Sequence, residues 1–332
     1  MDLHPAVDAS LAATARLGLR PYSELSPTEA RAEYRRVMAA RRGPDHRPMP
    51  VGAVDDLRID LEGRALAARR YRPAAAVVAG RPTLPTVVFF HGGGWVIGDL
   101  DSHDDLCRRI AQVLPAVVLA VDYRLAPEHP FPDPVEDAVD ATRWACAHVD
   151  DLGGDPDAVV VAGDSAGGAL ATVTARRARD AGTPAIAAQL LLYPVTDLTM
   201  STRSYVEMAS GYGLTAATMA WFLRHYDAPA DDPDASPSAA SDLSGLPPAV
   251  VSTASHDPLR DEGDAYAAAL RAAGVPTTHL RHHGLVHAYA LMEAVAPAIE
   301  ATEADLRALA DIFSGRGTPP PLEHVTLQGA DT

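Results

Sequence analysis

A serine between small residues is the first place in this chain where chemistry is expected. The segment GDSAG, Gly163 to Gly167, follows the apolar run Ala158–Ala162 and precedes a helix-prone stretch. A turn from strand to helix this tight needs glycine or very small residues beside the serine, and it holds the hydroxyl at the helix N-terminus. The pattern alone is weak, and a glycine-rich turn that holds a serine by coincidence is the alternative. Its position between strand and helix predicts Ser165 as a nucleophile.

Three consecutive glycines follow an earlier apolar run. The segment HGGGW, His91 to Trp95, comes at the end of Thr86–Phe90. Such a run is costly in chain entropy, and it suits a place where backbone N–H groups point into a cavity. We expect Gly93, Gly94 and Ala166 to donate these groups to an oxyanion. Phosphate binding is the competing use of a glycine loop, but the G-x-G-x-x-G spacing and a following ribose-binding acid are missing.

A serine hydroxyl needs a neighbouring base, and the base needs an acid that holds its tautomer. In the strand-turn-helix context the expected chain order is Ser, Asp, His. Asp257 follows the apolar run Ala249–Thr253, so it is predicted at the carboxyl end of a strand. Asp261 and Glu262 are near, but they fall in the first turn of the next helix, where acids commonly stabilise the dipole.

Four histidines lie between residues 279 and 287. His287 is the predicted base, because we place it beyond the last strand in a loop opened by Gly284. His279 falls within that strand and is expected to be structural or solvated. The spacing of His283 and His287 would suit zinc, but two histidines without a cysteine nearby make a poor closed site, so no metal is predicted.

The elements around these residues alternate in a pattern typical of an α/β protein. Apolar runs alternate with amphipathic segments, which predicts a mostly parallel sheet of about eight strands with helices on both faces. The expected strands are Leu57–Leu61, Leu66–Tyr71, Thr86–Phe90, Val117–Asp122, Ala158–Ala162, Ala187–Tyr193, Ala249–Thr253 and Thr277–Arg281. The expected helices lie near 103–113, 134–148, 166–181, 261–273 and 295–313.

Two stretches interrupt this alternation. We interpret residues 1–55 as a helical cap segment, in which Ser26 to Glu29 form a capping box. Residues 198–245, rich in aromatics, form a second predicted cap segment. The α/β core then comprises 56–197 and 246–314, and 315–332 is a loose tail. Surface helices without a substrate role are the alternative for both caps. The predicted substrate-pocket residues are Trp95, Asp164, Tyr193, Tyr212 and Trp221.

Composition excludes several classes of function. The formal net charge of −16 disfavours nucleic acid as a partner. All 28 basic side chains are arginine, which removes the lysine that P-loop, pyridoxal and S-x-x-K enzymes need. Two cysteines form no disulfide framework, and neither a secretory signal nor an apolar run long enough for a membrane span is visible. We therefore expect a cytoplasmic protein.

Together these motifs resemble the hormone-sensitive-lipase-like esterases, the bacterial family IV carboxylesterases, which are related to arylacetamide deacetylases. The resemblance covers about residues 85–292, and it is carried by HGGGW, SHDDLCRRIA, VDYRLAPEHPFP, GDSAGG, DPLRDEG and GLVHAY in this order. It implies an α/β-hydrolase fold, hydrolysis of short- or medium-chain acyl esters, no cofactor, and a possible homodimer. Trp95 and the pair Ala288-Tyr289 depart from the usual family residues, so the acyl or alcohol preference is not predicted.

Two other classes of function stay open. The same triad could transfer the acyl group to another acceptor, or support lyase chemistry, in a biosynthetic pathway. A hydrolase-fold ligand receptor, of the kind plants use for gibberellin, is the non-catalytic alternative. Such receptors lack the base, whereas His287 is present here.

Overall fold

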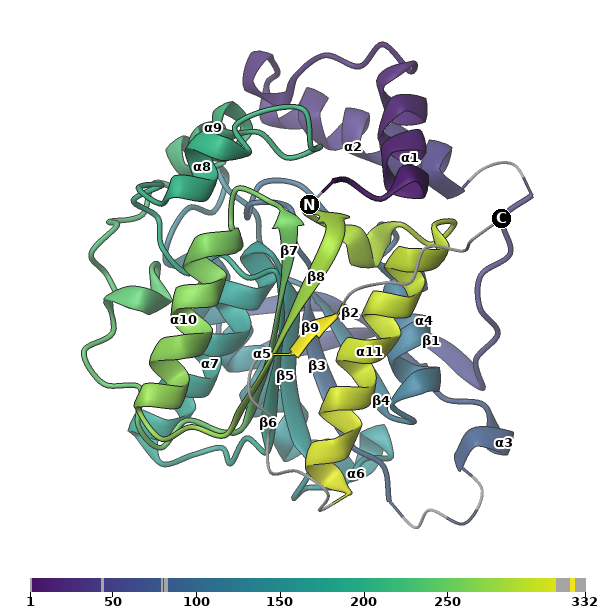
Figure 1. Ribbon diagram of the computed structural model, residues 1–332. Coiled ribbons are helices and arrows are strands. Elements are labelled where there is room, and N and C mark those ends of the chain that lie inside the picture. The colour runs from purple at the N-terminus through teal and green to yellow at the C-terminus, as the bar shows by residue number, and fades with distance from the viewer. Residues whose placement is uncertain (1, 43–44, 79, 81–82, 315–322, 326–332) are drawn as a thin grey trace.

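The apolar runs of the sequence form one twisted sheet at the centre of the molecule (Figure 1). This computed structural model describes residues 2–42, 45–78, 80, 83–314 and 323–325. Within these residues the strand order is β1-β2-β4-β3-β5-β6-β7-β8-β9. The strands are β1 (Ala53–Leu61), β2 (Arg64–Arg72), β3 (Thr86–Phe90), β4 (Val117–Asp122), β5 (Val159–Asp164), β6 (Ala188–Leu192), β7 (Ala249–His256), β8 (Thr277–Val286) and β9 (Glu323–Val325).

The direction of the strands brings the predicted site to one edge of the sheet. β2 pairs antiparallel with both β1 and β4, and the remaining neighbours pair in parallel. The carboxyl ends of β3, β5, β7 and β8 therefore meet at the same edge, which is the edge where open α/β sheets bind their ligands. The predicted α/β class with a mostly parallel sheet is confirmed.

Two details of the predicted strands differ from the structure. β8 continues to Val286, so Gly284 does not open a loop but lies inside the strand at a φ of 72°, beside an irregularity in the pairing with β7. In the predicted loose tail, β9 pairs in parallel with β8. The three residues of β9 are too few to show an apolar periodicity, so the sequence did not predict this edge strand. The rest of the predicted tail, 315–322 and 326–332, lies outside the described residues.

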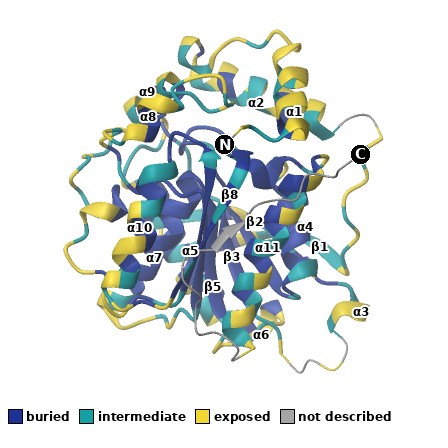
Figure 2. Ribbon diagram, viewed as in Figure 1, coloured by how far each residue is buried: buried dark blue, intermediate teal, exposed yellow. Residues whose placement is uncertain are grey.

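Helices cover both faces of the sheet and bury two hydrophobic cores against it. Helices α5, α6, α7 and α10 contribute to one core, and α4 and α11 to the other. Figure 2 shows the strands buried between the layers, while the outer sides of the helices are exposed. The bounds are α3 (Ala75–Val78), α4 (Asp104–Val113), α5 (Asp133–Ala147), α6 (Val149–Leu152), α7 (Ala166–Ala181), α10 (Arg260–Ala272) and α11 (Ala296–Phe313).

Four further helices lie beyond the carboxyl edge of the sheet (Figure 1). They are α1 (Pro5–Ala15), α2 (Pro27–Arg42), α8 (Arg203–Glu207) and α9 (Ala216–Tyr226). The expected capping box begins α2: the Ser26 amide donates to Glu29 Oε2 at 2.9 Å, and the Glu29 amide donates to Ser26 Oγ at 3.3 Å. These reciprocal bonds satisfy N–H groups that the first helical turn leaves free.

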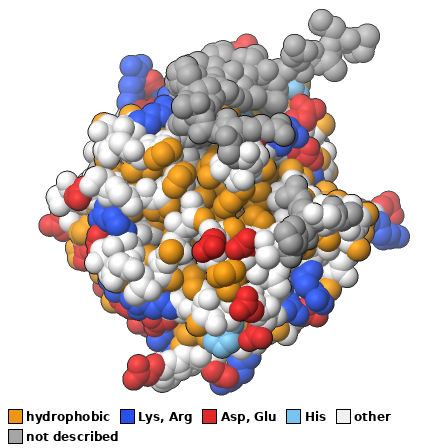
Figure 3. Space-filling model, turned by 90° about the horizontal axis from the view of Figure 1, so that it is seen from below, with side chains coloured by type: hydrophobic (Ala, Val, Ile, Leu, Met, Phe, Trp, Pro, Cys, Tyr) orange, Lys and Arg blue, Asp and Glu red, His pale blue; other side chains and the backbone are white. Residues whose placement is uncertain are grey.

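Figure 3 shows the face seen from below in the view of Figure 1, where hydrophobic side chains gather among acidic and basic ones. None of the helices in the described ranges is long and apolar enough to cross a bilayer.

Candidate active site

The turn after β5 holds Ser165 in a strained conformation. β5 ends at Asp164, α7 begins at Ala166, and Ser165 between them has φ 54° and ψ −119°. A non-glycine residue with such a dihedral costs about 1–3 kcal/mol and persists only where its surroundings impose it. The Ser165 amide donates to the Leu192 carbonyl on β6 at 2.9 Å. The turn therefore presents the Ser165 hydroxyl above the carboxyl end of the sheet.

The glycines around the serine are required by close backbone approach. A Cβ on Gly163 would lie 2.2 Å from the Gly167 carbonyl oxygen, and one on Gly167 would lie 1.9 Å from the Phe90 carbonyl oxygen. Either atom would overlap backbone that cannot move away without disturbing β3. The two glycines of GDSAG therefore allow the start of α7 to pack closely over β3 and β5.

Three side chains from separate loops meet in a hydrogen-bonded chain. His287 Nε2 lies 2.9 Å from Ser165 Oγ, and His287 Nδ1 lies 2.7 Å from Asp257 Oδ2. Asp257 directly follows β7, and His287 directly follows β8. The second Asp257 oxygen accepts the Leu259 amide at 2.8 Å, which orients the carboxylate. With Nδ1 donating to Asp257, Nε2 is the nitrogen left to accept the serine proton.

The glycine loop after β3 faces Ser165. Gly93 has a φ of 116° and Gly94 one of 58°, which L residues rarely adopt. A Cβ on Gly94 would lie 2.1 Å from the Phe222 ring, so α9 packs directly on this loop. Within the described residues the amides of Gly93, Gly94 and Ala166 have no hydrogen-bond acceptor. These are the three donors predicted for an oxyanion.

Asp164 links the glycine loop to the turn. This carboxylate is buried, accepts the Gly92 amide at 2.7 Å, and lies 3.2 Å from His103 Nε2. Burial raises the pKa of the Asp164 carboxyl, but the charge of His103 and the hydrogen bond from the Gly92 amide outweigh burial and hold that pKa below its ordinary value. The ionised Asp164 therefore holds Gly92, next to the oxyanion donors, against β5.

A second buried carboxyl lies close behind Asp257. Glu262 Oε1 accepts the Thr196 amide at 2.8 Å and the Asp197 amide at 3.3 Å. Burial, together with the charges of Asp197 and Asp257, raises the pKa of Glu262 well above its ordinary value. These effects outweigh the hydrogen bonds from the Thr196 and Asp197 amides and favour the neutral acid over the carboxylate at Glu262.

Comparison with known proteins agrees with this geometry. Residues 87–291 match a protein family described as having the alpha/beta hydrolase fold. This chain belongs to the alpha/beta hydrolase family. Its membership of the carboxylesterase branch, predicted from the motifs, is confirmed by relatives that are 45% identical.

Two curated relatives and two solved structures illustrate the similarity. Esterase LipI of Mycobacterium tuberculosis is 45% identical over 79% of this chain and 83% of its own length. An ethyl acetate hydrolase of Pseudomonas putida is 38% identical over 83% of this chain and 86% of its own. The structure of an ester hydrolase from the Lake Arreo metagenome, complexed with a phosphonate derivative, has a TM-score of 0.87 at 37% identity, covering 94% and 99% of the two chains. A hyperthermophilic esterase from Pyrobaculum calidifontis gives 0.82 at 40% identity, covering 95% and 99%.

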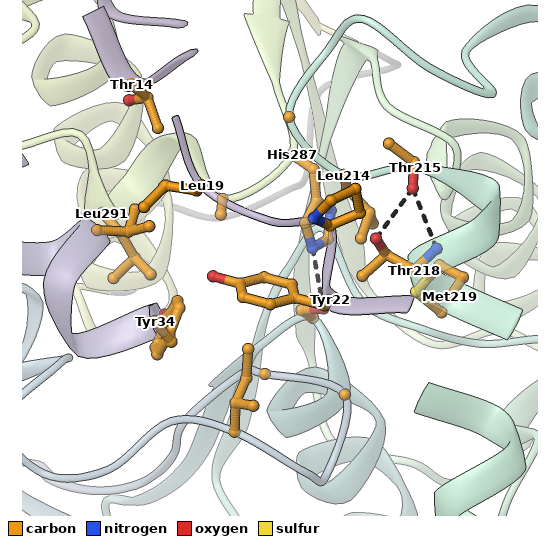
Figure 4. Close-up of a pocket in the computed structure, with 18 of the residues that line it drawn as sticks. Thr14, Leu19, Tyr22, Tyr34, Leu214, Thr215, Thr218, Met219, His287 and Leu291 are labelled. Atoms are coloured by element: carbon orange, nitrogen blue, oxygen red, sulfur yellow. Dashed lines mark hydrogen bonds between the residues drawn. The ribbon is translucent and has the colours of Figure 1, made fainter. Parts of the chain in front are cut away.

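Above Ser165 the hydrolase has a largely apolar cavity of about 470 Å³. Its walls come from the sheet edge and from both predicted cap segments. From the first cap segment, Leu11, Leu19, Tyr22 and Tyr34 line it, and from the second, Leu214, Thr218, Met219 and Phe222. Figure 4 shows Leu19 and Tyr34 on one side and Thr218 and Met219 on the other, with His287 between them.

The predicted pocket residues differ from this lining. Asp164 lines the cavity, but Trp95, Tyr193, Tyr212 and Trp221 are not among its described lining residues. Trp95 is fully buried, because its φ of 61° directs the indole into the core, where it stacks on Tyr226 at 4.0 Å between ring centroids.

The other three aromatics pack elsewhere for similar reasons. The Trp221 indole donates to the Leu25 carbonyl at 3.2 Å, joining the two cap segments. Tyr193 packs its ring edge-on against His287 with 5.0 Å between centroids, and Tyr212 packs on His256. Tyr193 thus supports the imidazole by packing against it, and it is not among the described lining residues of the cavity.

Residues that the sequence interpretation missed include Tyr22, Tyr34, Thr218 and Met219. Phe222 belongs to the aromatics of 198–245 that are expected from the sequence to line the pocket, and it does line the cavity. Thr218 and Met219 share one face of α9 with Phe222, so a helical stripe contained a usable signal for both. Tyr34 follows the helical stripe of Ala30, Val37 and Met38 in α2, which by itself indicates packing rather than a pocket. Nothing in the local pattern of Tyr22, which lies in a short 3-10 turn at Tyr22–Glu24, distinguishes it from a surface tyrosine.

Proposed function

We propose that this hydrolase cleaves carboxylic esters through an acyl-enzyme on Ser165. The observation that carries the proposal is the Asp257–His287–Ser165 chain, with bonds of 2.7 Å and 2.9 Å, facing the glycine loop. The relatives named as esterases and ester hydrolases support the same reaction class.

In the first step Ser165 Oγ attacks the ester carbonyl while His287 Nε2 takes its proton. The carbonyl oxygen becomes an oxyanion, which the Gly93, Gly94 and Ala166 amides stabilise. When the tetrahedral intermediate collapses, the protonated His287 gives its proton to the leaving alcohol. Asp257 stabilises the imidazolium throughout without taking a proton itself.

In the second step a water molecule attacks the acyl-enzyme. His287 removes its proton, the same amides hold the second oxyanion, and Ser165 leaves with the proton returned by His287. The products are the carboxylic acid and the free enzyme. No cofactor enters either step.

We propose further that residues 1–55 and 198–245 act as a cap that selects short- and medium-chain esters. Side chains of α1, α2 and α9 line the cavity, so an acyl or alcohol group bound there contacts the cap. A cavity of about 470 Å³ lies at the small end of the usual range for small-molecule sites, about 300–1,000 Å³.

The direct test is hydrolysis of p-nitrophenyl butyrate by the purified protein and by Ser165→Ala. Ser201→Ala, at an exposed position, is the matched control and should keep wild-type activity. An organophosphonate ester should add once to the wild type, by intact mass, and not to Ser165→Ala. Absence of hydrolysis above background, or full activity of Ser165→Ala, would show the proposal to be wrong.

A further inference from the structure

Arg41, near the end of α2, lines the substrate cavity without an electrostatic partner. Its Nε is buried, and in the described part of the chain Arg41 has neither an ion-pair nor a hydrogen-bond partner. Its helix neighbours are all paired: Arg31 with Glu128 at 2.6 Å, Arg35 with Asp99 at 3.9 Å, Arg36 with Glu33 at 2.6 Å and Arg42 with Asp105 at 2.7 Å. A buried guanidinium nitrogen without an acceptor is costly and calls for an explanation.

The positive charge of Arg41 acts on the hydroxyl groups of two tyrosines in the cavity. Tyr22 and Tyr34 both line the cavity, and neither hydroxyl donates a hydrogen bond to another described residue. Burial raises the pKa of Tyr22 to about 12 and raises that of Tyr34 further, while the charge of Arg41 opposes both shifts. Both hydroxyls are therefore neutral donors at pH 7. In Figure 4 the Tyr22 hydroxyl points away from His287, toward the side where Leu291 and Tyr34 lie.

Arg41, Tyr22 and Tyr34 line the same cavity as Asp164 and Ser165. The charge of Arg41 lowers the pKa of Tyr34, and the charge of Asp164, the residue beside Ser165, raises it.

Within the described lining of the cavity, no acid is free to neutralise Arg41. Among the described residues that line it, only Asp164 is acidic, and its charge is engaged by His103 and the Gly92 amide. Arg20 also lines the cavity, but it pairs with Glu29 at 2.9 Å and is largely exposed. The apolar lining therefore surrounds one uncompensated positive charge, although the whole chain carries −16.

We propose that the substrate of this hydrolase is an ester that carries a carboxylate remote from the scissile bond, and that Arg41, Tyr22 and Tyr34 bind this carboxylate. The inference rests on the proposed ester hydrolysis and names its substrate class. A guanidinium fork matches the two oxygens of a carboxylate, and one positive charge balances one negative charge. A phosphate dianion would leave a charge unmatched in an apolar cavity.

The test uses two pairs of esters in which one member carries a remote carboxylate and the other a neutral group of similar size at the same place. On the acyl side they are mono-4-nitrophenyl adipate and 4-nitrophenyl hexanoate, and on the alcohol side 4-butanoyloxybenzoate and its methyl ester. We expect Arg41→Gln to lower kcat/KM for the anionic member of at least one pair by about tenfold or more. Its neutral counterpart should change less than about twofold. Arg41→Lys should fall between, because it keeps the charge but not the fork.

Arg36→Gln is the matched control, since it removes the same charge from an exposed position on α2 that does not line the cavity. It should change neither pair. Tyr22→Phe combined with Tyr34→Phe gives a second test that keeps the ring packing, and it should lower kcat/KM for the same anionic ester by about threefold or more. Melting temperatures check that each variant folds.

The outcomes separate this inference from the proposed function. Equal loss on the neutral and anionic members of both pairs, or no loss on either, overturns the carboxylate site. Failure of the wild type to hydrolyse any of the neutral esters overturns the proposed function instead. If the site is correct, raising ionic strength should reduce the anionic preference of the wild type and leave that of Arg41→Gln unchanged.

Discussion

Asp164 and His103 form a buried pair directly behind the nucleophile, with 3.2 Å between a carboxylate oxygen and the imidazole Nε2. The same carboxylate oxygen accepts the Gly92 amide. The residue before Ser165 therefore joins the turn after β5, the loop after β3 and the start of α4. A change at Asp164 is expected to affect the oxyanion donors and the stability of the fold together.

Asp164→Asn should lower kcat/KM about 10- to 100-fold, since a supporting contact behind the donors is weakened. It should also destabilise the protein at pH 7. Because the folded-state pKa of Asp164 is depressed, its contribution is complete above the unfolded pKa, about 4, and is lost as pH falls through the folded pKa. Urea unfolding of the two proteins should show the stability gap narrowing below about pH 4. A gap that stays constant with pH would contradict the ionised pair.

Glu262→Gln should have the opposite pH dependence. The folded-state pKa of Glu262 is raised, so the wild type loses stability as pH rises from the unfolded pKa, about 4.3, toward the folded one. Gln, which resembles the neutral acid, has no such loss. The variant should gain on the wild type by up to about 1.4 kcal/mol per pH unit in that window, as measured by urea unfolding. Glu24→Gln, at an exposed position, should show no comparable trend.

Asp257→Asn should reduce kcat by roughly 10⁴-fold, because the amide can present an N–H to His287 and favour the wrong tautomer. Asp261→Asn tests the specificity of this assignment, since Asp261 is a nearby acid that pairs with Arg260 rather than with the imidazole. It should keep kcat within about threefold. Equal losses in the two variants, measured with p-nitrophenyl butyrate, would refute the role of Asp257.

Gly94→Ala should abolish most activity. The new Cβ would overlap the Phe222 ring, and the φ of 58° is strained for alanine. Gly274→Ala isolates the strain alone, since Gly274 has a φ of 80° but no heavy atom near its Cβ position. That variant should lose about 1 kcal/mol of stability and keep its kcat/KM. Adding Phe222→Ala to Gly94→Ala should restore part of the activity, and no rescue would argue against the contact as the cause.

Substitutions at Phe222 and Trp95 should have different effects: the first should change the acyl chain-length preference, and the second should change only the stability. Phe222 lines the cavity, so Phe222→Ala should shift the optimum in a p-nitrophenyl ester series toward longer acyl chains. Trp95 is buried against Tyr226 outside the cavity, so Trp95→Phe should leave the optimum in place and lower the free energy of unfolding by about 1–3 kcal/mol. A changed optimum in Trp95→Phe would mean that its packing controls the cavity.

Local constraints explain why the reacting residues were accessible to sequence interpretation. Ser165 needs glycines at two nearby positions because backbone passes within contact distance, and such requirements leave a short motif. Asp257 and His287 follow apolar strands whose parallel order brings their ends together. Each of these signals is readable within about ten residues of chain.

The substrate pocket left no such signal. Trp95, Tyr193, Tyr212 and Trp221 are aromatic and close to the site in sequence or space, but backbone dihedrals and packing partners decide which way each ring points. Arg41 likewise reads as one more arginine on a charged helix. Its lack of a partner becomes visible only when the carboxylates around its neighbours are placed in three dimensions.

The sheet edge and the cap helices form different walls of the cavity, and this affects how the substrate range can diverge between related sequences. Ser165, Asp257 and His287 lie in turns anchored to the sheet, whereas other walls of the cavity come from α1, α2 and α9. Substitutions in these helices can change the range of esters that the protein accepts while the catalytic residues and the reaction stay the same.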